Sequence, residues 1–123
     1  MSSPKHYSTF RVAFTEALAT HLTVVQEGAL FCKLTGRIDS TADSDNYYIQ
    51  IINENELPNN GAVTFLMAPL KVAHVNGIDS TFDIDLAPEY VKAKNGIFVV
   101  VSTTEFTKTI ITSDWLSCTA VYR

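Results

Sequence analysis

Three Asn-Gly pairs constrain this chain more than any other feature. They are Asn60-Gly61, Asn76-Gly77 and Asn95-Gly96, and each directly precedes a run rich in strand-forming residues. Both residue types tolerate the positive φ that tight type I′ turns between antiparallel strands require. We therefore expect a chain that reverses direction repeatedly. An alternating β/α fold is excluded, because the sequence leaves no room for crossover helices.

Alternation of apolar and polar residues predicts the strands between these turns. The expected strands cover Phe10–Thr15, His21–Val25, Leu30–Ile38, Tyr47–Ile52, Ala62–Met67, Lys71–Val75, Thr81–Leu86, Ile97–Ser102, Thr107–Ile111 and Leu116–Arg123. Within Leu30–Ile38, even-numbered residues are expected on one face and odd-numbered residues, beginning with Phe31, on the other. Tyr47–Ile52 and Ile97–Ser102 are apolar on both faces, which is typical of strands that lie centrally in a sheet.

Many short strands without a long helical period predict an all-β fold. We expect a single-domain antiparallel β-sandwich, of the jelly-roll or Ig-like type, over residues 10–123. The chain of 123 residues is long enough to bury a hydrophobic core that is stable without disulfides or a structural metal ion. The polar residues 1–9 are expected to form an extended N-terminal arm.

Composition narrows the class of partner. The net charge is −4, and the basic residues are scattered, so neither nucleic acid nor an anionic membrane surface is expected as a partner. The start of the chain lacks the apolar core of a signal peptide, and no apolar run is long enough to cross a bilayer. We expect a protein that stays in the cytosol unless it leaves inside an assembled particle.

The two cysteines, Cys32 and Cys118, each lie in an apolar strand-like run. Their environment predicts buried thiols that behave as small hydrophobic groups. A disulfide would require the two strands to face each other, which the sequence leaves open. Two cysteines without Cys-x-x-Cys spacing do not predict a zinc site.

Signatures of catalysis are absent from the sequence. There is no nucleophile elbow, phosphate-binding glycine loop or zinc-protease helix motif. His6, His21 and His74 are far apart in sequence and are expected to be incidental. Asp83 and Asp85 share one face of a predicted strand and are expected to face solvent, so a small hydrolase that uses them is the weakest alternative. We expect no enzyme and assign no catalytic residue.

The acidic loop Asp39–Asn46 is the best candidate for a metal site. Asp43, Asp45 and Glu54 have the spacing of the first, third and twelfth positions of a calcium loop. Tyr47 and Tyr48 occupy the positions where an oxygen ligand and a glycine are needed. We therefore expect a solvated loop, with no metal and no cofactor.

Aromatic side chains provide a second hypothesis. The set in question is Tyr47, Tyr48, Tyr90, Phe106 and Trp115. They are too many for one small core, so some can stack on sugar rings or anchor a neighbouring subunit. The alternative function is therefore a carbohydrate-binding β-sandwich that binds a receptor or glycan. We expect Trp115 and one of the adjacent tyrosines in the core.

The C-terminal region resembles a family of small tailed-bacteriophage proteins. The similarity lies in the run Gly96–Thr104, a threonine-rich segment, and a last strand that closes as Thr119–Arg123. An earlier strand, Tyr48–Asn53, followed by a loop with Pro58, also matches the family pattern. The resemblance spans Leu30 to Arg123, and the longer N-terminal part, Met1 to Glu27, departs from it.

This resemblance implies a structural role in a virion. The family comprises virion structural β-sandwich proteins that decorate or cement a capsid, or belong to a neck, tail or fibre. It implies that the chain is assembled in the host cytoplasm and is located in the virion. The implied partners are the major capsid protein, other virion proteins and further copies of this chain, with a trimer as one candidate symmetry.

Overall fold

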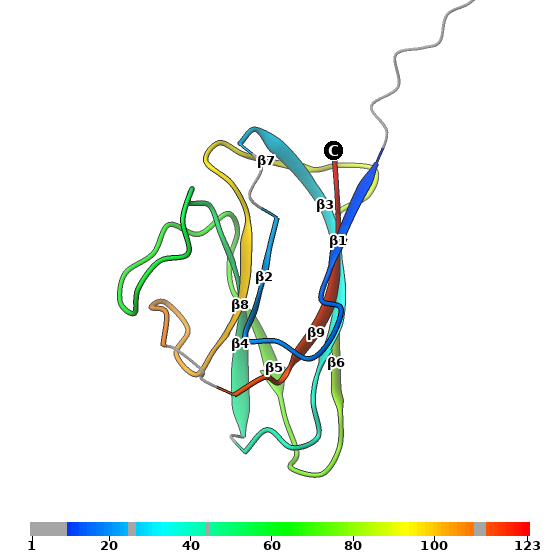
Figure 1. Ribbon diagram of the computed structural model, residues 1–123, viewed down its shortest axis with the longest axis vertical. Coiled ribbons are helices and arrows are strands. Elements are labelled where there is room, and N and C mark those ends of the chain that lie inside the picture. Colours follow the sequence, from blue (N-terminus) through cyan, green and yellow to red (C-terminus); the bar gives the residue numbers. More distant parts are fainter. Residues whose placement is uncertain (1–9, 25–26, 44, 110–112) are drawn as a thin grey trace, which may run out of the picture.

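The computed structural model describes residues 10–24, 27–43, 45–109 and 113–123, so the predicted arm at residues 1–9 lies outside the described residues. In this part of the chain the strands are β1 (Arg11–Phe14), β2 (His21–Thr23), β3 (Ala29–Ile38), β4 (Asn46–Ile52), β5 (Leu70–Ala73), β6 (Ser80–Asp85), β7 (Val91–Ala93), β8 (Phe98–Ser102) and β9 (Leu116–Tyr122). They form two antiparallel sheets that face each other (Figure 1). The predicted all-β sandwich is confirmed.

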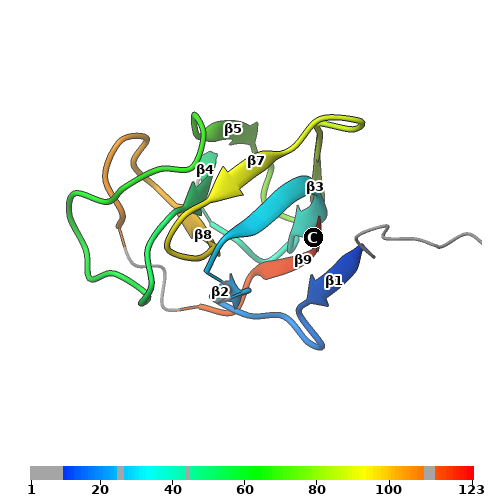
Figure 2. The same ribbon diagram turned by 90° about the horizontal axis from the view of Figure 1, so that it is seen from above.

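Strand order shows how the chain builds these layers. One sheet has the order β1-β9-β3-β6, with β7 also paired to β3, and the other has the order β2-β8-β4-β5. Figure 2 shows the layers from above, with β7 beside β3 at one end. Most consecutive strands belong to different sheets, so the chain passes repeatedly from one layer to the other. The paired segments are consequently distant in sequence, as in the pairing of Val12 with Val121.

The main core fills the space between the two sheets. Its fully buried side chains come from both inner faces and include Phe31, Leu34, Ile38, Tyr47, Ile49, Ile51, Val99 and Leu116. The Tyr47 ring packs edge-on against His74 and Trp115, with ring centroids 5.7 and 6.0 Å away. Burial of one large apolar side chain stabilises a fold by about 1.5–3 kcal/mol, so this layer is the main source of stability.

A smaller apolar cluster lies on the outer side of the β2-β8-β4-β5 sheet. It joins Ile52 of β4 to Phe98 and Val100 of β8, with Val63 packed against it. In Figure 1 the loops between β4 and β5 and between β8 and β9 lie over this side of the sheet. The cluster explains why β4 and β8 are apolar on both faces. Their predicted central position is confirmed, since each has a strand on both sides.

A β-bulge changes the faces of β3. The register against β9 shifts between Phe31, which pairs with Tyr122, and Lys33, which pairs with Val121. Phe31 and Leu34 are both fully buried in the main core as a result. The prediction that Phe31 lies on the opposite face from Leu34, with the other odd-numbered residues, is therefore wrong. One extra residue in a strand reverses the alternation beyond it.

Gly36 allows β3 and β9 to approach closely. A Cβ atom at this position would lie 2.5 Å from the Ser117 carbonyl oxygen and 2.7 Å from both the Cys118 Cβ and the Phe82 ring. Two of these atoms belong to the paired strand β9, and the third belongs to a core side chain on β6. No side chain fits here without displacement of backbone.

Of the three Asn-Gly pairs, only Asn76-Gly77 forms a hydrogen-bonded turn, whereas Asn60 and Asn95 lie at bends, and none of the pairs forms a hairpin between strands that pair with each other. All three glycines have positive φ, as predicted. Asn76-Gly77 lies between β5 and β6, and Asn95-Gly96 lies between β7 and β8, and both connections join different sheets. A glycine is required at position 96 because a Cβ there would lie 2.7 Å from the Glu54 carbonyl oxygen. The turn chemistry is therefore used to move the chain between layers.

Two predicted strands are wrong. Residues 62–67 form only isolated contacts with β4, through hydrogen bonds from Asn53 N to Thr64 O and from Leu66 N to Ile51 O, both 2.8 Å. In the predicted strand Thr107–Ile111, residues 107–109 contain only a bridge from Lys108 to Gly61, and residues 110–111 lie outside the described part. Both segments cover a sheet and do not extend it.

The close approach at Gly36 gives a test of the fold. Gly36→Ala should lower the free energy of unfolding by about 1–3 kcal/mol, because the added methyl group overpacks against backbone that cannot move independently. Chemical denaturation measures the change. Thr35→Ala, on the opposite face of the same strand, is the control and should have a smaller effect. Equal effects of the two substitutions would contradict the packing role of Gly36.

Candidate functional site

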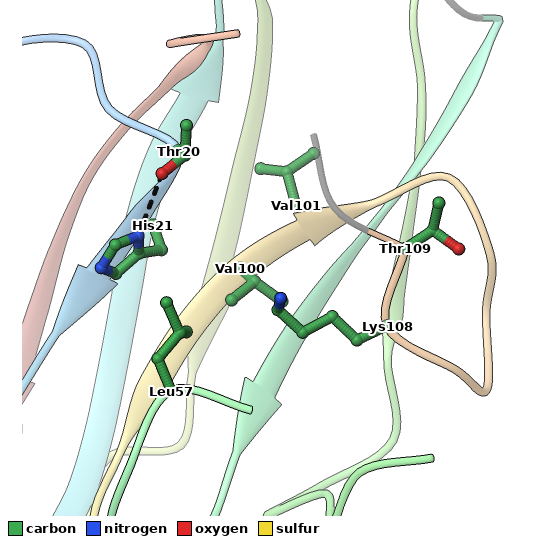
Figure 3. Close-up of a pocket in the computed structure, with 7 residues that line it drawn as sticks. All are labelled: Thr20, His21, Leu57, Val100, Val101, Lys108 and Thr109. Carbon is green, nitrogen blue, oxygen red and sulfur yellow. Dashed lines mark hydrogen bonds between the residues drawn. The ribbon is translucent and has the colours of Figure 1, made fainter. Parts of the chain in front are cut away.

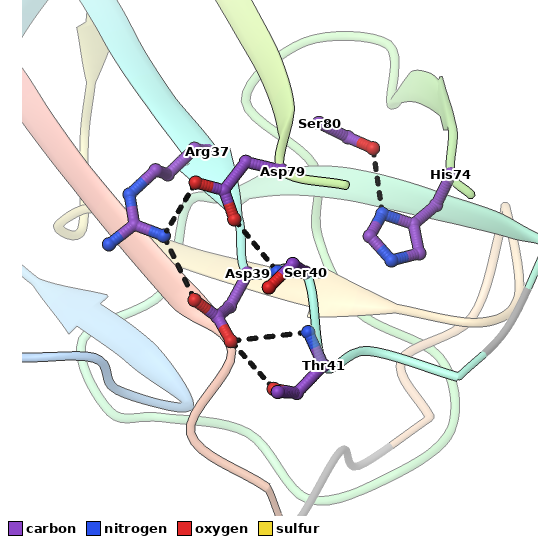
Figure 4. Close-up of polar contacts among 7 residues, drawn as sticks. All are labelled: Arg37, Asp39, Ser40, Thr41, His74, Asp79 and Ser80. Atoms are coloured by element: carbon purple, nitrogen blue, oxygen red, sulfur yellow. Dashed lines mark hydrogen bonds and ion pairs between the residues drawn. The ribbon is translucent and has the colours of Figure 1, made fainter. Parts of the chain in front are cut away.

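The structure separates the predicted histidines. His21 lies on β2 and His74 follows β5, at opposite edges of one sheet, and His6 lies outside the described residues. His74 is buried, with its Nδ1 2.7 Å from Ser80 Oγ, as Figure 4 shows, and its Nε2 3.0 Å from the Ala42 carbonyl. A carbonyl only accepts, so Nε2–H donates. His74 thus connects two loops.

The acidic loop forms an ion-pair network that connects two chain segments (Figure 4). Arg37 Nη1 lies 3.0 Å from Asp39 Oδ1 and 3.4 Å from Asp79 Oδ2. Thr41 donates to Asp39 through its hydroxyl and backbone N–H, and Ser40 N–H donates to Asp79. Hydrogen bonds from Thr41 and Arg37 hold the pKa of the Asp39 carboxyl below its usual value. The two carboxylates are already occupied by protein donors.

The predicted calcium-spaced residues do not converge. Asp43 and Asp45 are exposed before β4, whereas Glu54 follows β4 and accepts a hydrogen bond from Thr64 N at 3.1 Å. Among the described residues there is no group of three or more His, Cys, Asp or Glu side chains placed to hold a metal ion. Asp83 and Asp85 lie on the solvent face of β6, as predicted.

The exposed aromatic side chains do not gather in one platform. Trp115 packs on Tyr47 in the core, while Phe106 and Tyr90 are exposed. Tyr90 lies near the Arg123 guanidinium, whose carbon is 5.4 Å from the Tyr90 ring centroid and 4.3 Å from that of Phe10. The prediction that Trp115 and one of the adjacent tyrosines belong to the core agrees with this arrangement.

A pocket of about 130 Å³ lies on the outer side of β2 and β8 (Figure 3). Its lining residues are Thr20, His21, Leu57, Val100, Val101, Lys108 and Thr109. His21 enters it because His21 pairs with Val100 in the antiparallel register of β2 and β8. Leu57 comes from the loop after β4, and Lys108 comes from the loop after β8. The pocket is therefore assembled from four separate segments.

Lys108 is held in place through its backbone. Its N–H and carbonyl pair with the carbonyl and N–H of Gly61 at 2.8 and 2.9 Å. The residue is 7% exposed, and burial lowers the pKa of its amine. Burial and the charge of Lys108 lower the pKa of His21, whose Nδ1 lies 3.0 Å from Thr20 Oγ1. The pocket thus combines a partly desolvated amine with an imidazole whose protonated form is disfavoured.

Gln50 anchors the loop that carries Lys108. It is fully buried on β4, and its Nε2 lies 3.0 Å from the Thr104 carbonyl and 2.8 Å from the Thr107 carbonyl. Ser102 Oγ also donates to the Thr107 carbonyl, at 3.2 Å. These bonds fix the loop on both sides of its tip. They are positioned to hold the Lys108 side chain at the pocket.

Sequence reasoning missed the pocket. Lys108 is one of several scattered basic residues in the sequence, and nothing local indicates that it is buried. The only hint is the apolar pattern of the segment around it, which predicted a strand. Burial of the amine depends on two loops that fold back over β8, and no short-range pattern encodes that contact.

A second candidate surface lies on the outer face of β1. Val12 and Phe14 of this edge strand, and Phe10 directly before it, occupy alternate positions and are 54%, 56% and 49% exposed. We call these three side chains the β1 strip. Among the described strands, β1 has only β9 as a partner. Ala13 faces the other way and packs against the core. The strip is an apolar row beside an unpaired strand edge.

The outer face of this sheet changes character from one edge to the other. Register places Phe14, Thr119, Thr35 and Asp83 in one row across β1, β9, β3 and β6. A parallel row runs from Val12 of the strip to Asp85, which lies 4.0 Å from Lys33 Nζ. The face is therefore apolar at the β1 edge and acidic at the β6 edge.

The two thiols are buried and free. Cys32 lies on β3 and Cys118 on β9, and neither is paired. Gly36, not Cys32, is the register partner of Cys118. Burial raises the pKa of the Cys118 thiol to about 12. Reactive-thiol chemistry needs a depressed pKa and access, and Cys118 has neither.

Comparisons with known proteins provide no relative. No family model, no curated protein and no solved structure matches this chain. The described residues also contain no helix that is long and apolar enough to span a membrane. The function is therefore proposed from the two surfaces described above and from the resemblance at the C-terminal end.

The buried Cys118 thiol makes a prediction about pH. The free thiol titrates near 9.0 and the folded one near 12, so between these values only the unfolded chain loses the proton. The unfolding free energy should then fall by up to about 1.4 kcal/mol per pH unit above pH 9. Cys118→Ala should make this decline less steep. Urea denaturation of both proteins below and above pH 9 measures the two slopes, and identical slopes would contradict the assignment.

Proposed function

We propose that this chain is a non-enzymatic structural protein of a phage virion, and within that class a capsid decoration or cement protein. It would act through contacts with other copies of itself and with the major capsid protein or other virion proteins. The resemblance of Gly96–Thr104 and Thr119–Arg123 to small tailed-bacteriophage proteins supports this proposal.

Strand order also supports the proposal. The strand order β1-β9-β3-β6, with the short β7 added beside β3, forms one sheet, and the order β2-β8-β4-β5 forms the other. We infer that this is a jelly roll, an architecture built from two Greek keys that is widespread in viral capsid and lectin domains. A fold of this kind is compatible with several functions, so a contact surface has to carry the argument.

The β1 strip is the observation that carries the proposal. Its three apolar side chains are half-exposed on an unpaired strand edge, which is an arrangement that favours association. Covering each side chain would contribute roughly 1 kcal/mol, since about half of its full burial remains to be gained. A stable interface needs a larger area, so the strip would form the apolar centre of a wider contact.

Charge supports contact at this edge. Asp83 and Asp85 lie at the opposite edge of the same face, where two copies would repel each other. Association of identical subunits is therefore favoured at β1 and disfavoured at β6. We propose a homo-oligomer formed in this way, with a trimer as one candidate symmetry.

Light scattering after size exclusion tests the oligomer. Val12→Lys should dissociate it, because the new charge lies at the centre of the apolar contact. Ile78→Lys changes an equally exposed apolar residue in the turn between β5 and β6, and it should leave the mass unchanged. Sedimentation with the parent capsid tests the particle contact. A monomeric wild-type protein that never sediments with capsids would disprove the proposal.

Glycan binding is the second candidate function. It is favoured by the same strand order, which lectin domains share, and by the exposed Tyr90 ring beside Arg123. A glycan array should then give signals that Tyr90→Ala abolishes and that Phe106→Ala, at a separate exposed loop, retains. Repeating the array with a chelator tests any dependence on calcium. If the wild-type protein binds no glycan on the array, the glycan-binding proposal is contradicted and the structural role is the single remaining proposal.

A further inference from the structure

Lys108 is a buried lysine without a counter-ion. The chain has 13 Asp and Glu residues, and all of them fall within the ranges that the structure describes. Lys108 forms none of the ion pairs among the described residues, and its amine forms no hydrogen bond there. Most of the Lys108 side chain is withdrawn from water, while the amine still reaches the open pocket. An anion that enters the pocket would therefore meet a partly desolvated charge that has no protein partner among the described residues.

The amine points into the pocket. Figure 3 shows the Lys108 side chain extending past Val100 toward the side that carries His21 and Leu57. His21 approaches from the opposite wall, on β2, and its Nε2 has no hydrogen-bond partner among the described residues. In the tautomer in which the Thr20 hydroxyl donates to Nδ1, Nε2 carries the proton and can donate to a ligand. Two donors thus converge on one space.

Three apolar side chains and two threonines, Thr20 and Thr109, complete the lining. Leu57, Val100 and Val101 form walls without hydrogen-bonding side chains. The volume of about 130 Å³ is close to that of an engineered cavity of about 150 Å³ that holds benzene. The space therefore suits an apolar group of about four to six carbon atoms. The two donors lie where the charged end of such a molecule would sit.

We propose that this pocket binds a small monocarboxylate with a compact apolar body, such as a branched short-chain fatty acid. One carboxylate oxygen would accept from the Lys108 ammonium, and the other would accept from His21 Nε2–H. The apolar body would contact Leu57 and the two valines. A phosphate is disfavoured, because its two charges and three terminal oxygens need more donors than one lysine and one imidazole supply, and the lining adds no arginine and no cluster of backbone N–H groups.

Electrostatics agrees with a single negative charge. Burial and the charge of Lys108 lower the pKa of His21, which disfavours a second positive charge beside the amine. A carboxylate beside Lys108 would also favour the charged amine, which burial alone disfavours. The ligand and the lysine would each compensate the desolvation of the other.

Titration of the protein with sodium isovalerate, followed by ¹H–¹⁵N NMR, tests the proposal. Saturable shifts should occur at residues of the pocket, with a Kd on the order of 1 mM. Isoamyl alcohol, with the same apolar body and no charge, and sodium chloride at equal ionic strength should not give them. Lys108→Met should weaken binding at least tenfold, whereas Lys71→Met, at an exposed position on β5, should not change it.

A second measurement uses the unaltered chain and does not depend on folding of the variant. Isovalerate should slow acetylation of the Lys108 amine, relative to that of Lys71, when peptides are quantified by mass spectrometry. Isoamyl alcohol should not protect it. Acetylation of Lys108 that is unchanged at saturating isovalerate, or equal affinity of the wild type and Lys108→Met, would overturn the proposal. Both results are independent of the oligomeric state.

Discussion

Pairing of β3 with β9 is the contact on which the rest of the molecule depends. β3 also pairs with β6 and β7, and β9 also pairs with β1, so these two strands hold one entire sheet together. Gly36 permits their close approach, and Ser117 and Cys118 leave no room for a side chain there. Residues that pair between β3 and β9 lie about 80 residues apart in the chain. During folding, the entropy lost on closing this long loop must be met before the paired strands can stabilise the sheet.

The second sheet depends on its loops in a different way. β4 and β8 are apolar on both sides, so their outer face needs a cover, and the loops after each strand supply it. The Gln50 side-chain amide donates hydrogen bonds to backbone carbonyls of the loop after β8, and that loop places Lys108 over β8. The same covering that completes the small apolar cluster also buries an amine. The pocket thus results from the way in which the loops cover the outer apolar face of β4 and β8.

Much of the fold was predictable from local pattern, and the exceptions have physical causes. Alternation located β6 and its faces correctly, because Phe82 and the residues around it keep strict period-two spacing. It failed at Phe31, where a bulge adds a residue. It also failed at residues 62–67, where a strand-like composition serves to cover β4 without joining the ladder. The candidate site was not predictable, because Lys108 looks like any other surface lysine in the sequence.

The sequence by itself determined the class of fold, the positions of most strands and the positive φ of the glycine in each Asn-Gly pair. These properties follow from side-chain periodicity and backbone preference, which act over a few residues. Tertiary structure alone decided which strands pair, which apolar row remains exposed on β1 and which lysine is buried. These outcomes depend on contacts between segments such as β1 and β9, or Gly61 and Lys108. Such contacts arise because two apolar sheet faces must be covered at once, and no short stretch of residues contains that information.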